Sequence, residues 1–96
     1  MEWCFETCGG AVRVRQEGDR ASCQALRAMT GEGLYKAWLL GQGGRRFLLG
    51  TLIPEGGALK LRRSVTLTQL REKGVWPPTG AEIAMAYRFT PAEGDR

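Results

Sequence analysis

Turn-forming residues recur along this chain at short and regular intervals, and this recurrence limits the folds open to it. Clusters containing glycine lie at residues 8–10, 17–19, 30–33, 41–44, 54–57 and 74–80, mostly 9 to 13 residues apart. Glycine adopts the positive φ angles of tight turns without a side-chain clash. No helix of ordinary length fits between these turns, so the sequence predicts short strands joined by hairpins.

The alternation of apolar and polar residues places the individual strands. Apolar side chains alternate with arginine or lysine around residues 12–15 and 59–62, and mainly with alanine over residues 83–89. Residues 20–29 alternate poorly, although their place between two turns still favours a strand. We therefore expect an all-β fold of six or seven antiparallel strands, arranged as a sandwich or a small open barrel.

Residues 34–53 differ from the other strands because they are apolar on both faces. We expect strands at 34–40 and 46–53, joined by the turn at 41–44, with a bulge or close backbone approach at Gly50. One face is expected to hold Leu34, Trp38, Leu40, Phe47, Leu49 and Ile53, and the other Tyr35, Ala37, Leu39, Leu48 and Leu52. Strands that are apolar on both faces need cover on both. Either a short helix or a second copy of the chain is expected to supply it.

One short helix is expected near residues 67–73. Thr66, followed three residues later by Gln69, fits a capping box, and Gly74 takes the position that follows a helix end. Residues 75–80 contain two prolines, which cannot donate to a helix or a sheet ladder. These residues are therefore expected to form an exposed, extended linker before the last strand.

A single β domain is expected over residues 1–89, followed by a flexible C-terminal tail at residues 90–96. A chain of 96 residues can bury enough surface for one core and no second one. The predicted core contains Trp3, Phe5, Val12, Val14, Leu34, Trp38, Leu40, Phe47, Leu49, Ile53, Leu59, Leu61, Ile83, Met85, Tyr87 and Phe89.

The net charge of +4 is unevenly distributed, because residues 11–88 hold thirteen basic residues against six acidic ones. A basic body favours phosphate-rich or acidic partners, and it also serves solubility alone. Alternating strand positions and one hairpin end predict a cationic surface made of Arg13, Arg15, Arg45, Arg46, Lys60 and Arg62. Single-strand nucleic-acid binders combine such a surface with exposed aromatic side chains. Here only Tyr35 and Trp76 are expected to be exposed.

Arrangements able to carry catalysis are scarce. The chain has no histidine, which excludes Ser-His and Cys-His nucleophile pairs and histidine-ligated metals. A serine–lysine dyad is conceivable from Ser22 or Ser64 with Lys60 or Lys73. The glycine-rich residues 41–44 precede a strand pattern rather than the helix that a phosphate-binding loop needs. We therefore expect no enzyme activity and no cofactor.

The three cysteines are expected to be plain thiols. Cys4 and Cys8 would lie about 13 Å apart on an extended strand, too far for a disulfide or a shared metal unless the chain folds back. No apolar run approaches the ~20 residues of a membrane span, and the first residues lack the apolar core of a signal peptide. We expect a cytoplasmic protein without metal or membrane contact, whose thiols stay reduced.

The sequence contains Gly33-Leu34-Tyr35, then Leu49-Gly50-Thr51-Leu52-Ile53-Pro54-Glu55-Gly56-Gly57 and Leu59-Lys60-Leu61. This pattern resembles one seen in small uncharacterised β-rich proteins of Gram-positive anaerobes, and the resemblance covers about residues 11–70. It implies a bacterial β-rich domain. Because its motifs are turn and strand residues, the resemblance implies no activity.

Two functions remain after these exclusions. We expect a non-catalytic protein-interaction module that binds a second copy of itself or another protein through the two-sided apolar hairpin. Its expected partner-binding residues are Tyr35, Leu39, Leu48, Leu52 and Trp76. The alternative is a nucleic-acid-binding β domain that uses the cationic surface.

Overall fold

The computed structural model describes residues 1–29, 31 and 33–88 of the chain. Phe89 and the predicted tail at 90–96 lie outside the described residues. The strands are β1 (Glu2–Thr7), β2 (Gly10–Glu17), β3 (Arg20–Ala28), β4 (Gly33–Leu40), β5 (Arg46–Thr51), β6 (Ile53–Glu55), β7 (Ala58–Thr66) and β8 (Gly80–Arg88). The helix α1 spans Leu67–Glu72, and a 3₁₀ turn, η1, spans Gln42–Gly44. The expected all-β fold with one short helix is confirmed.

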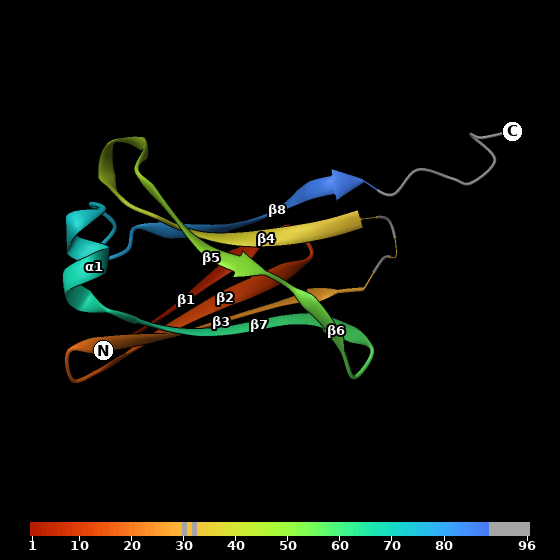
Figure 1. Cartoon of the computed structure of the whole chain (residues 1–96), viewed down its shortest axis with the longest axis horizontal. Coiled ribbons are helices and arrows are strands. Elements are labelled where there is room, and N and C mark those ends of the chain that lie inside the picture. The colour runs from red at the N-terminus through yellow and green to blue at the C-terminus, as the bar shows by residue number, and fades with distance from the viewer. Residues whose placement is uncertain (30, 32, 89–96) are drawn as a thin grey trace, which may run out of the picture.

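The strands form two antiparallel sheets packed face to face (Figure 1). The larger sheet has the order β1-β2-β3-β7-β6, and the smaller has the order β5-β4-β8. Tight turns join β1 to β2 and β2 to β3, as the glycine clusters predict. The pairing of β3 with β7 joins segments that are far apart in the sequence. The two separate sheets make a sandwich and not a closed barrel.

The predicted strand at 46–53 is two strands that belong to different sheets. Gly50 has a φ of 146°, a conformation that side chains rarely adopt, and the pairing of β4 with β5 shifts register opposite it. Leu52 then donates its backbone N–H to the carbonyl oxygen of Tyr35 at 2.9 Å. Beyond this bend, β6 pairs with β7 in the larger sheet. The predicted bulge at Gly50 is confirmed, and the bend raises the strand number to eight.

The core lies between the two sheets. Its buried residues include Val12, Val14, Ala21, Cys23, Ala25, Tyr35, Ala37, Leu39, Phe47, Leu49, Leu52, Leu59, Val65 and Ile83. Trp3, Phe5, Leu61 and Met85 are half-buried against it. The poor alternation of residues 20–29 has a plain cause, because β3 faces inward with small side chains at Ala21, Cys23 and Ala25.

The predicted orientation of residues 34–40 is wrong. Tyr35, Ala37 and Leu39 point into the core, while Leu34, Trp38 and Leu40 point outward. When both faces of a strand are apolar, alternation shows which residues share a face but not which face is inside. Register with β5 settles the question, because Leu39 pairs with the buried Phe47.

Two further residues of the predicted core are exposed. Ile53 is 60% exposed because the bend after Gly50 turns Leu52 inward in its place. Tyr87 is 57% exposed because the register between β4 and β8 shifts beside it, which pairs Tyr87 with the outward Leu34.

The helix α1 closes one end of the sandwich (Figure 1). Thr66 caps it by accepting a hydrogen bond from the backbone N–H of Gln69 at 3.2 Å, as predicted. Gly74, with a φ of 77°, donates to Arg71, and Val75 donates to Leu70, which is the Schellman pattern of a helix end.

The linker after α1 is less exposed than predicted. Val75 is completely buried, and Pro78 is buried too. Thr79 fastens the end of the linker to β4 by donating its backbone N–H to Leu40 at 2.9 Å. The helix and its linker therefore seal the end of the core rather than a sheet face.

Candidate interaction surfaces

The outer surface of the smaller sheet carries apolar side chains that no helix covers. We define the apolar face as Leu34, Trp38, Leu40, Leu48 and Tyr87, which point away from the core on β4, β5 and β8. Leu34 is 43% exposed and Leu48 is 37% exposed. Trp38 pairs directly with Leu48 on one side and with Glu82 on the other. These pairings place Leu48 beside Trp38 with Glu82 beyond them on β8, and they place Leu34 beside Tyr87.

A charged cluster sits over the tryptophan of the apolar face. The guanidinium carbon of Arg46 lies 4.1 Å from the centre of the Trp38 ring, a cation–π distance. The same guanidinium lies 3.5 Å from a carboxylate oxygen of Glu82. The cluster neutralises both charges and leaves this part of the surface with little net charge.

Most of the predicted partner-binding residues lie elsewhere. Tyr35, Leu39 and Leu52 are buried in the core of their own chain and cannot meet a partner in this conformation. Trp76 is half-buried near α1, where its ring meets that of Trp3 edge-on at 4.9 Å. Only Leu48 belongs to the apolar face. Leu34, Trp38 and Leu40 were correctly predicted to share one face of the strand, but that face was predicted to be in the core and instead points outward.

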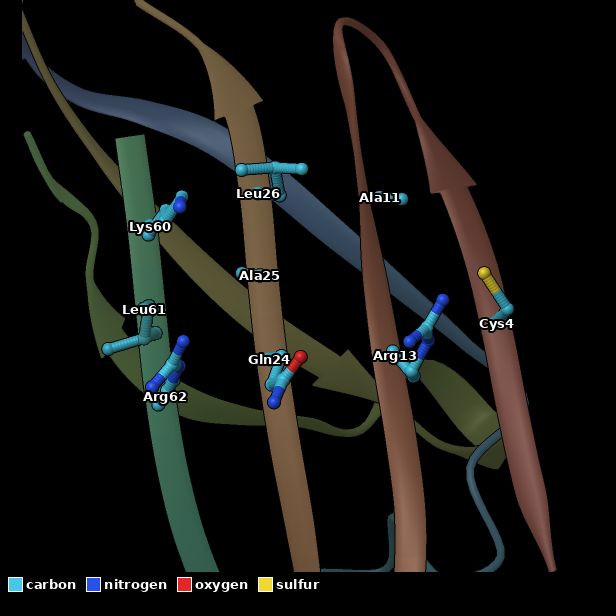
Figure 2. Close-up of a pocket in the computed structure, with 9 residues that line it drawn as sticks. All are labelled: Cys4, Ala11, Arg13, Gln24, Ala25, Leu26, Lys60, Leu61 and Arg62. Carbon is cyan, nitrogen blue, oxygen red and sulfur yellow. The ribbon is translucent and has the colours of Figure 1, made fainter. Parts of the chain in front are cut away.

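A second surface lies on the outside of the larger sheet. The register brings Arg13, Gln24 and Arg62 into one row across β2, β3 and β7, with Cys4 of β1 at the end of the row (Figure 2). Arg15 lies in the row on one side, and Lys60 in the row on the other. The four predicted cations of β2 and β7 therefore share a face, although β3 separates the two strands.

The remaining two predicted cations are not part of that surface. Arg46 lies on the apolar face of the other sheet, and Arg45 follows the turn η1 and packs against Gly74. The turn itself is followed by the strand β5, so residues 41–44 form the expected hairpin turn and not a phosphate loop. The six predicted basic residues are thus divided between two sheets.

Three of these cations, Arg13, Lys60 and Arg62, line a shallow depression of about 250 Å³. Its lining also includes Cys4, Ala11, Gln24 and Leu26. Arg13 forms an exposed ion pair with Glu2 at 3.5 Å, which is worth little at a solvated surface. The depression combines positive charge with an amide group and a few small apolar side chains.

The predicted serine–lysine dyad of Ser64 with Lys60 is not formed. Ser64 accepts a hydrogen bond from Arg20 at 2.9 Å. Lys60 lies four residues away on the same strand, which is about 13 Å and too far for a dyad. Among the described residues, no three histidine, cysteine or carboxylate side chains meet in a group that could hold a metal. Within the same residues, no helix is long and apolar enough to cross a membrane.

The three cysteines are free thiols. Cys4 and Cys8 are exposed, whereas Cys23 is buried in the core. Burial raises the pKa of the Cys23 thiol from 9.0 to about 11, against a smaller opposing effect of the Arg63 charge. This thiol stays protonated and unreactive near neutral pH.

Comparison with known proteins gives no match. No family model matches the chain, and neither a curated protein nor a solved structure is significantly similar to it.

Proposed function

We propose that this domain is a non-catalytic protein-interaction module that self-associates through its apolar face. The observation that carries the proposal is the outward position of Leu34, Trp38, Leu40 and Leu48 on a sheet whose other side already forms the core. The helix α1, which was expected to cover one face of the hairpin, lies instead at the end of the sandwich (Figure 1). A second copy of the chain is the remaining candidate for cover.

The size of the apolar face supports an interface. Three strands of about eight residues give a plan of roughly 27 by 14 Å at the usual rise and strand spacing. This is roughly 400 Å² for the whole outer surface of the sheet, which also carries Lys36, Arg46 and Glu82, and single apolar patches within this range are often functional on a monomer. Two sheets with the same right-handed twist also pack well face to face, with their strands about 30° apart.

Charge favours a second copy as the occupant. The whole chain carries +4, so two copies repel one another if their basic surfaces meet. On the apolar face, Arg46 is already paired with Glu82, and Lys36 of β4 points outward between Leu34 and Trp38, which brings one further positive charge from each copy. Two copies that meet at this face keep the outward cations of β2 and β7 on opposite outer sides.

Sedimentation at tens of micromolar tests the proposal, and we expect a species of twice the 10.6 kDa chain mass. Leu48→Glu places a charge beside Trp38 on the proposed interface and should give the monomer, because taking a charge out of water costs several kcal/mol. Ile53→Glu is the matched control. Ile53 is 60% exposed on the larger sheet, so this variant should remain dimeric.

A wild-type chain that sediments only at 10.6 kDa would overturn the proposal. Equal dissociation of both variants would show that the added charge, and not its place, is responsible. The domain is proposed to work in the cytoplasm, where the exposed Cys4 and Cys8 would stay reduced.

A further inference from the structure

Four outward-pointing cations on β2 and β7 of the larger sheet form a continuous track. We define the cationic track as Arg15, Arg13, Arg62 and Lys60, which all point outward from β2 and β7. Residues two apart on a strand lie about 7 Å apart, and strands two apart in a sheet lie about 10 Å apart. The track therefore runs diagonally for about 17 Å, with Gln24 at its centre (Figure 2).

The track holds positive charge that the protein itself does not neutralise. Arg15, Lys60 and Arg62 make no ion pair or side-chain hydrogen bond with any described residue. Arg13 shares its charge with Glu2, which lies on the edge strand β1. The acidic residues Glu2 and Glu6 border the track on that edge, and Glu17 borders its Arg15 end, so an anionic ligand is directed over β2, β3 and β7 toward Arg62 and Lys60.

Among the described residues, no aromatic side chain lies beside the track. Its neighbours on the outer surface are Cys4, Ala11, Gln24 and Leu26. The aromatic residues in the described ranges are Trp3, Phe5, Tyr35, Trp38, Phe47, Trp76 and Tyr87, and these lie on the inner face, on the smaller sheet or in the linker. A base therefore has no ring to stack on, and recognition must come from charge and hydrogen bonds.

We propose that the cationic track binds single-stranded nucleic acid through its backbone phosphates and without base stacking. A flexible chain of phosphates offers one anion after another along a diagonal path, whereas a small anion would engage a single row. No helix or hairpin projects from this face in the described residues, so nothing enters the groove of a duplex. Gln24 donates from its amide to a phosphate held between Arg13 and Arg62.

Fluorescence anisotropy with a labelled oligothymidylate of about twelve nucleotides tests the proposal over a range of salt concentrations. Four phosphate contacts predict a log–log slope of about −3 for a single strand. The double variant Arg13→Gln/Arg62→Gln should weaken binding at low salt by about tenfold or more and lower the slope to about −1.4.

The matched control is Arg71→Gln/Lys73→Gln, at the C-terminal end of α1. It removes the same two charges from exposed positions outside the track, and its affinity should fall by less than about threefold. Thermal unfolding of all variants checks that each one is folded. Equal losses in both double variants would overturn the track as the binding site, because only net charge would then matter.

Three further results would overturn the proposal. The first is the absence of binding to oligothymidylate at low salt. The second is an affinity for oligoadenylate about tenfold higher, which would require base stacking. The third is tighter binding of inorganic polyphosphate, or of a duplex, than of a single strand with equal charge. These three results do not depend on whether the chain self-associates, because a short oligonucleotide can bind within the single cationic track of one chain.

Discussion

Arg63 fastens the two sheets together along one edge. Its guanidinium donates to the carbonyl oxygens of Leu48 and Leu49, at 3.4 and 3.0 Å, and lies 5.6 Å from the Phe47 ring. These carbonyl groups belong to β5, an edge strand of the smaller sheet, and edge groups need partners. A side chain of β7 thus supplies hydrogen bonds to an edge strand of the other sheet, which no neighbouring strand supplies on that side.

Cys23 lies opposite Arg63 in the register, on the inner side of the larger sheet. Its pKa is raised from 9.0 in the unfolded chain to about 11 in the fold, mainly because burial disfavours the thiolate. The folded state therefore holds the thiol proton more tightly. The associated stability is fully present below pH 9 and is lost as the pH rises toward 11.

The variant Cys23→Ala tests this linkage, since alanine already occupies the neighbouring inward positions of β3. Between pH 9 and 11 the wild-type free energy of unfolding should fall by about 2 kcal/mol more than that of the variant. Urea unfolding at several pH values measures both. If the two proteins lose stability in parallel, Cys23 titrates normally and the expected effect of burial is absent.

At the scale of the elements, the backbone of the β4–β5 hairpin lies against the backbone that follows α1. Gly41 lies directly against the backbone of Gly74 and Val75, and a Cβ atom at Gly41 would overlap the carbonyl oxygen of Gly74. Gly80 lies at the same end of the sandwich, but a Cβ there would be 3.6 Å from Leu40, an ordinary contact.

Two single substitutions to alanine distinguish these glycines. Gly41→Ala should lower the free energy of unfolding by about 2–3 kcal/mol, because the backbone of α1 must move away from the hairpin. Gly80→Ala should change it by less than about 0.5 kcal/mol, since the strand conformation suits alanine. Thermal unfolding measures both, and a tolerated Gly41→Ala would show that the hairpin and the helix end are not in contact.

Local sequence signals predicted the local elements. The glycine clusters placed the hairpins, and Thr66 with Gln69 placed the start of α1, because turns and caps depend on a few neighbouring residues. The orientation of β4 could not be predicted, because Leu34 and Tyr35 are both apolar and only pairing with β5 decides between them. The bend that sends β6 to the other sheet also depends on a distant strand, β7.

The candidate surfaces follow the same division. Arg13 and Arg15 were assigned to one outer face because alternation within a strand is local. The separation of Arg46 from these residues, and the place of β3 between β2 and β7, depend on the order of strands in the two sheets. Tyr35 is buried instead of Trp38 because pairing with β5 decides which face of β4 is inside. The sequence therefore predicted an apolar hairpin correctly but assigned the wrong side of it to the surface.

At the scale of the whole molecule, the two proposed surfaces lie on opposite layers of the sandwich (Figure 1). The apolar face belongs to the smaller sheet, and the cationic track belongs to the larger one. A dimer formed through the apolar face therefore presents two cationic tracks that face away from each other. Each track is complete within one chain, so dimerisation adds a second site without changing the first.

This arrangement predicts a dependence on oligonucleotide length. A strand of about forty nucleotides is long enough to pass around a dimer and reach both tracks, and the second contact is then intramolecular. The wild-type protein should bind it about tenfold or more tightly than the twelve-nucleotide strand, beyond the gain from overlapping sites alone. Leu48→Glu should remove this additional gain and leave the affinity for the short strand unchanged.

The control for the added charge is Gln42→Glu, because Gln42 is exposed in the turn η1 and lies outside both surfaces. This variant should keep the wild-type dependence on length. Anisotropy with the two oligonucleotides, together with sedimentation of the same samples, measures binding and association side by side. If Leu48→Glu is monomeric but keeps the full gain with the long strand, the tracks act singly and the dimer has no part in binding. If Leu48→Glu loses both the dimer and the additional affinity for the long strand, the two surfaces act together. The apolar face then determines how many cationic tracks one strand can reach.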